Sequence, residues 1–138
     1  MLKTKLIHPE ILGALGKLGH GSHVLIADGN YPVATQSHPH AQRVYLNLAP
    51  GIVSATNVLR ALIDVIPIEG EAVMEPASGK SPAILREFRN LLPKGIVIEP
   101  LTRVMFYTAA SNSTTGLVIA TGEQRIYGNL LLTIGVVK

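Results

Sequence analysis

Residues 18–32, LGHGSHVLIADGNYP, contain the features on which the fold assignment depends. His20 stands between two glycines, and a run of apolar residues then ends at Asp28. A short apolar run bounded by turn-forming residues is typical of a buried strand. The stretch therefore predicts a strand over 23–28, with an imidazole just before it and a carboxylate at its far end.

Helical and strand patterns alternate along the rest of the chain. Pro9 suits the first position of an early helix that Gly19 can end, and Ser81 followed by Pro82 is typical of an N-cap and first helical residue. Helices are predicted at 8–19, 54–66, 81–92 and 101–110. Further strands are predicted at 43–48, 72–75, 96–100, 115–121 and 129–137, and residues 29–42 are predicted to form a loop.

Alternating strands and helices indicate an α/β fold, a layered subunit with a mostly parallel central sheet flanked by helices. The last two predicted strands could pair as a hairpin, or the last one could join a neighbouring subunit. The length of 138 residues suits a single domain over 1–138.

The composition excludes several classes of protein. Hydrophobic residues make up 47% and charged residues only 15%, so we expect part of the surface to be buried against other copies in a homo-oligomer. The twelve Lys and Arg residues are scattered, which argues against nucleic acid as a partner. Cysteine is absent, and no apolar run is long enough to span a membrane. The start of the chain lacks an apolar leader, so a cytoplasmic location is expected.

Asp28 and His20 are the first candidate functional residues. Ligands of open α/β sheets bind outside the carboxyl ends of the strands, which is where Asp28 is predicted, although the same carboxylate could simply cap the following turn. A histidine titrates near neutral pH and suits general acid or base chemistry, but a lone loop histidine is more often a surface residue. A buried strand could hold His20 and Asp28 near one cavity, and this combination favours a functional interpretation.

The segment RIYGN, residues 125–129, provides a second candidate site. Tyr127 offers a hydroxyl, Gly128 lets the backbone approach closely, and Asn129 can both donate and accept hydrogen bonds. This mixture suits a polyhydroxylated ligand, although an ordinary turn would use the same residues. Arg103 lies before an apolar helical stretch. It is either a charged surface residue or a guanidinium that donates hydrogen bonds to ligand oxygens.

Other familiar sites are not predicted. His38 and His40 lie close together without an acidic neighbour, which is a weak set of metal ligands, so no metal is expected. The phosphate-binding loop, the dinucleotide-binding glycine pattern and the nucleophile elbow of hydrolases have no match in the sequence.

The sequence resembles the L-fucose mutarotase and D-ribose pyranase family over nearly its whole length. The resemblance rests on HPEILGALGKLGHGSHVLIADGNYP near the start, LTRVMFY in the second half and TGEQRIYGNLLLTIGVV at the end. Arg103 and the residues of the first and last segments are similar to those of the fucose mutarotase branch of the family. The segment MEPASGKSPAILREF departs from the family pattern by being shorter and less acidic.

The resemblance implies a cofactor-free isomerase acting on free monosaccharides. It implies that His20 is the proton donor and that the sugar is bound by Asp28, Arg103, Tyr127, Gly128 and Asn129. Beyond the resemblance, we hypothesise that Tyr127 is also catalytic and relays a proton or binds a sugar oxygen. It also implies ring-shaped assemblies, often decamers, with pockets near subunit boundaries.

Three alternatives to an L-fucose mutarotase remain open. A ribose pyranase is a related enzyme, and Arg103 argues against it. A non-catalytic sugar-binding accessory of a transport system would need the pocket but no imidazole. A structural oligomer with a vestigial site would bind no monosaccharide.

Overall fold

A single six-stranded sheet organises the fold, and the computed structural model describes residues 1–77 and 79–138. Ser78, within the segment that departs from the family pattern, lies outside the described residues. The strand order is β2-β5-β1-β6-β3-β4. The strands are β1 (His23–Ala27), β2 (Gln42–Tyr45), β3 (Ile68–Met74), β4 (Val97–Leu101), β5 (Thr115–Ala120) and β6 (Leu130–Ile134). Only the two pairings that involve β6 are antiparallel, so the predicted mostly parallel central sheet is confirmed.

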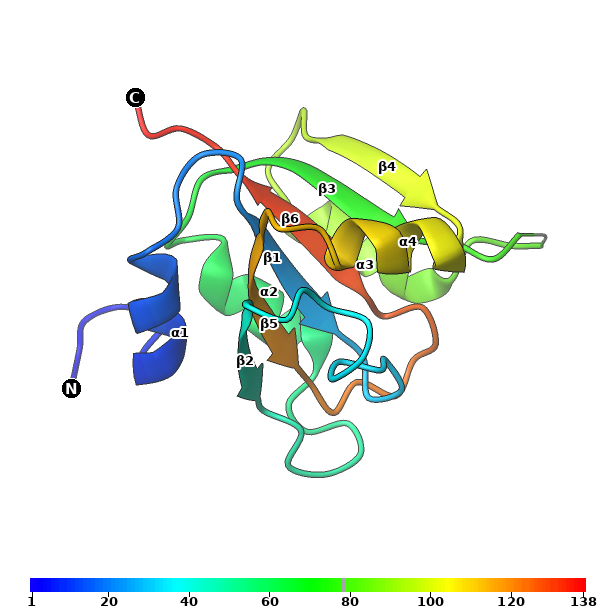
Figure 1. The fold of residues 1–138 in the computed structure, drawn as a ribbon, viewed down its shortest axis with the longest axis horizontal. Helices are drawn as coiled ribbons and strands as arrows, with labels where there is room; N and C mark the ends of the chain where they lie inside the picture. Colours follow the sequence, from blue (N-terminus) through cyan, green and yellow to red (C-terminus); the bar gives the residue numbers. More distant parts are fainter. Residues whose placement is uncertain (78) are drawn as a thin grey trace.

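The last strand does not form a hairpin with the strand before it. β1 lies between β5 and β6, with Leu25 opposite Leu131 in the antiparallel pair. β6 also pairs with β3, so it is a central strand of its own subunit. The segment 121–129 therefore passes beyond the end of β1 before the chain turns back into the sheet (Figure 1).

Helices cover both faces of the sheet, as predicted. The helices are α1 (Pro9–Leu15), α2 (Ala55–Leu62), α3 (Ala83–Leu91) and α4 (Arg103–Ala110). In Figure 1, α4 lies in front of the sheet, whereas α2 and α3 lie behind it. None of the helices in residues 1–77 and 79–138 is long and apolar enough to cross a membrane.

The first helix is shorter than its predicted range. The ring of His8 accepts a hydrogen bond from the backbone N–H of Ile11 at 3.4 Å, and Pro9 occupies the predicted first position. Gly16, and not Gly19, is the C-cap, because the helix already ends at Leu15. The chain between Gly16 and β1 is therefore free to form the loop that contains His20.

The start of α3 also differs from the prediction. Pro82 has an extended backbone, with ψ at 142°, so it is the N-cap and the helix begins at Ala83. Ser81 is not the N-cap, and its hydroxyl instead donates a hydrogen bond to Glu75 Oε1 at 3.5 Å.

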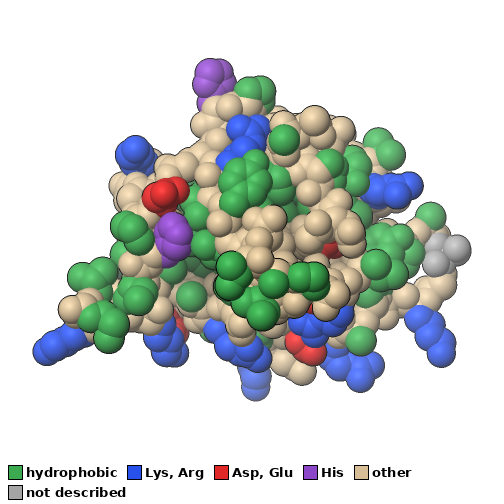
Figure 2. Space-filling view, turned by 90° about the horizontal axis from the view of Figure 1, so that it is seen from below, with side chains coloured by type: hydrophobic (Ala, Val, Ile, Leu, Met, Phe, Trp, Pro, Cys, Tyr) green, Lys and Arg blue, Asp and Glu red, His purple; other side chains and the backbone are tan. Residues whose placement is uncertain are grey.

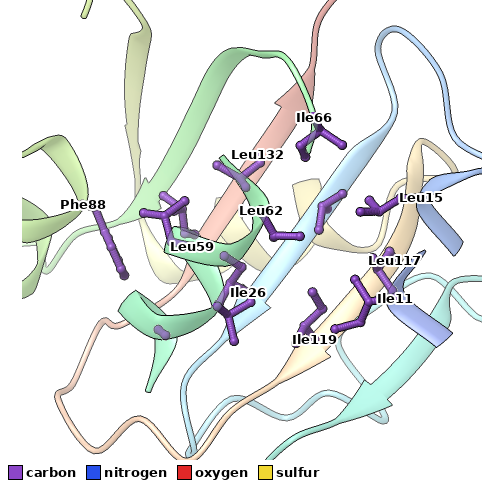
Figure 3. Close-up of a cluster of buried hydrophobic side chains, with 14 of the residues drawn as sticks. Ile11, Leu15, Ile26, Leu59, Leu62, Ile66, Phe88, Leu117, Ile119 and Leu132 are labelled. Atoms are coloured by element: carbon purple, nitrogen blue, oxygen red, sulfur yellow. The ribbon is translucent and has the colours of Figure 1, made fainter. Parts of the chain in front are cut away.

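Alternating side chains of the strands build two hydrophobic layers. Val24 and Ile26 of β1 point toward α1, α2 and α3, where the larger cluster lies (Figure 3). Leu25 and Ala27 point to the opposite face, where α4 and the loop after β1 cover them. Strands buried on both faces read as continuous apolar runs, which is why VLIA was recognisable in the sequence.

Glu71 in β3 is a buried carboxyl group within the larger layer. It lies opposite Ile98 and Leu132 in the sheet and is only 4% exposed. Neither of its carboxyl oxygens has a hydrogen-bond partner among the described residues. Burial raises the pKa of Glu71 to about 7, although the positive charge of Arg89 opposes the shift.

We predict that this glutamate makes stability fall as pH rises. Below pH 4.5 the carboxyl group is neutral in both states, whereas between 4.5 and about 7 the unfolded chain loses the proton first. The lost stability is of the order of 3 kcal/mol at pH 8. Urea unfolding of Glu71→Gln should show a smaller loss between pH 5 and pH 8 than the wild type. The control is Glu99→Gln, an exposed site on β4, and equal pH dependence in all three proteins would contradict the prediction.

Candidate active site

A polar cavity of about 280 Å³ lies beyond the carboxyl ends of β1 and β3. Its size is near the lower end of the range for small-molecule sites, about 300–1,000 Å³. The lining residues are Asp28, Asn30, Tyr31, Met74, Arg103, Tyr107, Ile126, Tyr127 and Asn129. They come from the loop after β1, the end of β3, the start of α4 and the segment before β6.

Asp28 and Asn129 join two walls of the cavity by reciprocal hydrogen bonds. The backbone N–H of Asp28 donates to Asn129 Oδ1 at 2.8 Å, and Asn129 Nδ2 donates to Asp28 Oδ2 at 2.9 Å. Both residues are buried. Because β1 and β6 are antiparallel neighbours, the end of one strand meets the start of the other, and the pair fixes that junction.

Asp28 lines the cavity and also caps the turn that follows it. Its Oδ1 accepts a hydrogen bond from the backbone N–H of Asn30 at 3.0 Å. Asp28 therefore lies in a cavity at the strand end, as predicted, and also caps the following turn, while its role in ligand binding stays a prediction. Burial raises the pKa of Asp28, and hydrogen bonds, chiefly from Asn30 and Asn129, oppose the shift by stabilising the carboxylate.

Aromatic contacts connect the loop after β1 to α4. The ring of Tyr31 packs edge-on against Tyr107 at a centroid distance of 5.4 Å and against Phe106 at 6.1 Å. The hydroxyl of Tyr31 donates to the backbone oxygen of Gln36 at 2.7 Å. Arg103 lies one helical turn before Tyr107, and its guanidinium forms no salt bridge with the described part of the chain, so it can bind a ligand.

Tyr127 reaches the cavity from an unusual backbone conformation. Its φ is 64°, and it is the one non-glycine residue with positive φ among the described residues. It lies in a turn that is closed by a hydrogen bond from the N–H of Gly128 to the oxygen of Arg125 at 3.2 Å. A left-handed conformation in a tyrosine costs of the order of 1 kcal/mol and persists only when surrounding contacts enforce it.

His20 does not line this cavity. It lies before β1, whereas Asp28 follows it, and a strand of this length separates residues 23 and 28 by about 17 Å. His20 Nε2 instead pairs with both carboxylate oxygens of Glu69, at 3.0 and 3.1 Å. The expectation that one copy of the chain holds His20 and Asp28 at a shared cavity is wrong, because the strand between them directs them to opposite ends of the sheet.

The structure thus gathers four of the predicted site residues and separates others. Asp28, Arg103, Tyr127 and Asn129 line one cavity, whereas Gly128 serves the backbone of the turn beside it. Five lining residues were not predicted from the sequence: Asn30, Tyr31, Met74, Tyr107 and Ile126. Tyr107 was detectable as the residue four positions after Arg103 on a predicted helix.

Glu69 was also missed, because no local pattern connects it to a histidine 49 residues earlier. No group of three or more His, Asp or Glu side chains suited to a metal ion occurs in the described ranges.

A cavity lined by polar groups at the carboxyl ends of parallel strands is typical of α/β proteins that bind small molecules. The chain belongs to the RbsD / FucU transport protein family, whose model matches residues 1–137.

A fucose mutarotase from Homo sapiens is 31% identical over 146 residues, which cover 95% of this chain and 90% of that protein. A D-ribose pyranase from Vibrio campbellii is 31% identical over 144 residues and covers 99% of both chains. The structure of FucU from Bifidobacterium longum superimposes with a TM-score of 0.82 at 30% identity and covers 96% of each chain. These matches confirm the resemblance, and the names of the two relatives describe sugar-isomerising enzymes.

We predict that Asn129→Ala destabilises the fold by about 1–3 kcal/mol, because it leaves buried groups of Asp28 without partners. It should also raise the pKa of the Asp28 carboxyl further, since one opposing hydrogen bond is lost. Urea unfolding and carboxyl-carbon NMR titration measure the two effects. Asn47→Ala, at an exposed position beyond β2, is the control. Equal stability of the two variants would contradict the prediction.

Proposed function

We propose that this protein is a monosaccharide mutarotase that interconverts the anomers of L-fucose or a related aldose. The observation that carries the proposal is the cavity, in which a carboxylate, a guanidinium, a phenol and an amide converge within a space of monosaccharide size. We assign this activity to a single domain over residues 1–138 and keep the cytoplasm as its expected location.

The cavity residues match what a sugar ring requires. Asp28 can accept hydrogen bonds from sugar hydroxyls, and Arg103 and Asn129 can hold others in place. Met74 and Ile126 supply apolar surface that suits the methyl group of a 6-deoxy sugar. D-ribose has no such methyl group, and this difference supports L-fucose over D-ribose as the substrate.

Mutarotation needs two proton transfers. A proton is delivered to the ring oxygen while the hydroxyl on the anomeric carbon loses one, and the bond between that carbon and the ring oxygen breaks. The open aldehyde rotates, and the steps reverse on its other face. We assign His20 as the donor to the ring oxygen and Tyr127 as the group that relays or binds at the anomeric hydroxyl. Each positioned acid or base contributes about 10²–10⁴-fold in enzymes generally.

A neighbouring copy of the chain must supply His20 in this proposal. The His20 side chain is 60% exposed and its partner Glu69 is 45% exposed, so the pair is accessible to another subunit. The Glu69 carboxylate contacts Nε2 of His20 and so orients the imidazole ring. Nδ1 of His20 is then left to face a sugar. The His20–Glu69 pair of a neighbouring copy would complete the cavity, whose own lining contains no histidine among the described residues.

The surface of the subunit supports such an assembly. Figure 2 shows several separate groups of hydrophobic side chains, set among polar and backbone atoms, on the face at the carboxyl ends of β1, β2 and β5. Leu48 and Ile126 in the loops at this end are 82% and 68% exposed. At the opposite end, near His20, Val136 and Val137 are also exposed. Two different apolar ends on one subunit favour head-to-tail contacts, which form a ring where the rotation between copies closes. We include such a ring in the proposal, for example the decamers that the family resemblance implies.

The activity test is exchange NMR on the anomers of L-fucose, D-galactose, L-rhamnose and D-ribose. We expect the exchange rate of L-fucose to rise in proportion to enzyme concentration. His20→Ala and Tyr127→Phe should each lower the enzyme-dependent rate by about 100-fold or more. His40→Ala and Tyr45→Phe, at exposed positions, should leave it unchanged. Tight binding without faster exchange would instead indicate a sugar-binding accessory, and faster ring-form exchange of ribose alone would indicate a pyranase.

Sharing of the site between copies gives a separate prediction. His20→Ala and Asp28→Asn should each be inactive alone, whereas a co-expressed mixture carrying two different tags should regain part of the wild-type exchange rate. Recovery is expected because some sites then combine an intact His20 from one copy with an intact Asp28 from another. A mixed assembly with no recovered activity would contradict the shared site.

A further inference from the structure

A cluster of charged residues lies next to the turn that carries Tyr127. Arg125 donates from Nε to Glu123 Oε1 at 2.9 Å and from Nη2 to Glu123 Oε2 at 2.9 Å, which is a two-pronged contact. The backbone N–H of Arg125 also donates to Glu123 Oε1 at 3.0 Å. Arg125 Nη1 reaches Glu87 of α3 at 2.8 Å. We call the contact between the two side chains of residues 123 and 125 the Glu123–Arg125 clamp.

Glu123 is a buried anchor for the segment that carries Tyr127. It is only 4% exposed, and its Oε2 accepts a hydrogen bond from the backbone N–H of Ala55 at 3.2 Å, at the start of α2. The hydrogen bonds from Arg125 lower the pKa of Glu123 despite its burial. The carboxylate therefore stays charged and fastens the loop to α2.

The clamp is in contact with the backbone that determines the position of Tyr127. A Cβ atom at Gly128 would lie 2.8 Å from Glu123 Cγ, so this glycine packs directly on the clamp. The turn from Arg125 to Gly128 places Tyr127 at its third position, where positive φ usually calls for glycine. Contacts beyond the turn's own hydrogen bond must enforce the conformation. The clamp supplies them, because it holds the first residue of the turn, Arg125, and packs against the last one, Gly128.

Arg125 is poorly suited to bind the sugar itself. All three guanidinium nitrogens, Nε, Nη1 and Nη2, already donate to carboxylates of Glu123 and Glu87. It is also absent from the lining of the polar cavity, whereas Ile126 and Tyr127 contribute to it. Its effect on the site must therefore act through another residue.

We propose that Glu123 and Arg125 are positioning residues that hold the phenol of Tyr127 at the cavity in its left-handed conformation. This inference rests on the proposed function for its kinetic consequence, because Tyr127 matters to the rate only if the cavity opens sugar rings. Its structural consequence, the fixed placement of the phenol, can be measured without any activity.

The kinetic test uses Arg125→Met, which keeps much of the aliphatic stem and removes the guanidinium. We expect kcat for L-fucose exchange to fall by about 10- to 100-fold with a smaller change in KM, because the phenol is misplaced. In the Tyr127→Phe background the same substitution should have no further effect on kcat, since both changes remove the same contribution, that of the Tyr127 phenol. Glu87→Gln, which keeps the clamp, is the matched control and should behave as the wild type. Independent, multiplicative effects of Arg125→Met and Tyr127→Phe would overturn the proposal.

The spectroscopic test uses 3-fluorotyrosine in place of the four tyrosines, with the Tyr127 signal identified from Tyr127→Phe. In Arg125→Met the Tyr127 fluorine signal should shift or broaden, and added guanidinium should restore both the signal and part of kcat. An unchanged Tyr127 signal in a folded Arg125→Met protein would overturn the proposal.

Two other outcomes also test the proposal. If Arg125→Met does not fold, Arg125→Lys is judged by the same two results, because it keeps the charge but loses the two-pronged contact. If the wild type accelerates no sugar exchange, the proposed function fails, and the fluorine signal alone decides whether the clamp places Tyr127.

Discussion

The reciprocal hydrogen bonds between Asp28 and Asn129 are the contact on which the cavity depends. They connect residues 101 positions apart in the chain and fix the junction of two central antiparallel strands. A buried carboxylate is costly unless donors surround it, and Asp28 has such donors. Glu71 of β3 shows the contrast, since it is about as buried as Asp28 but its carboxyl oxygens have no hydrogen-bond partner in the described part of the chain. Placement of donors, more than burial, therefore distinguishes a polar group that can serve a site from one that only lowers stability.

The antiparallel course of β6 brings the segment 121–129 to the cavity. β6 begins where β1 and β3 end, so the residues before it lie beside the strand ends where ligands of α/β sheets bind. The sequence predicted the helices, the strands and the mostly parallel sheet from the alternation of elements. It could not predict that β6 inserts between β1 and β3, because a strand buried on both faces has the same apolar pattern in either direction.

The candidate site was predictable where chemistry and position coincide in the sequence. Asp28 ends an apolar strand, and Tyr127 and Asn129 stand in a polar turn before the last strand, so a local pattern points to each. Met74 and Glu69 carry no such pattern, since a methionine at a strand end and a glutamate at a strand start are common in any fold. The separation of His20 from Asp28 follows from strand geometry alone, because residues that flank a strand on its two sides cannot meet within one copy.

That geometry has a consequence for how the proposed reaction must be organised. The cavity contains groups that can hold a sugar, and its lining offers Tyr127 and Asp28 for proton transfer but no imidazole. His20, already oriented by Glu69, lies at the other end of the sheet on an accessible surface. A subunit with a cavity at one end and an oriented imidazole at the other can join them only by stacking against a second copy. The role proposed for His20 therefore depends on assembly, and apolar side chains exposed at both ends are available for the hydrophobic contact that such stacking needs.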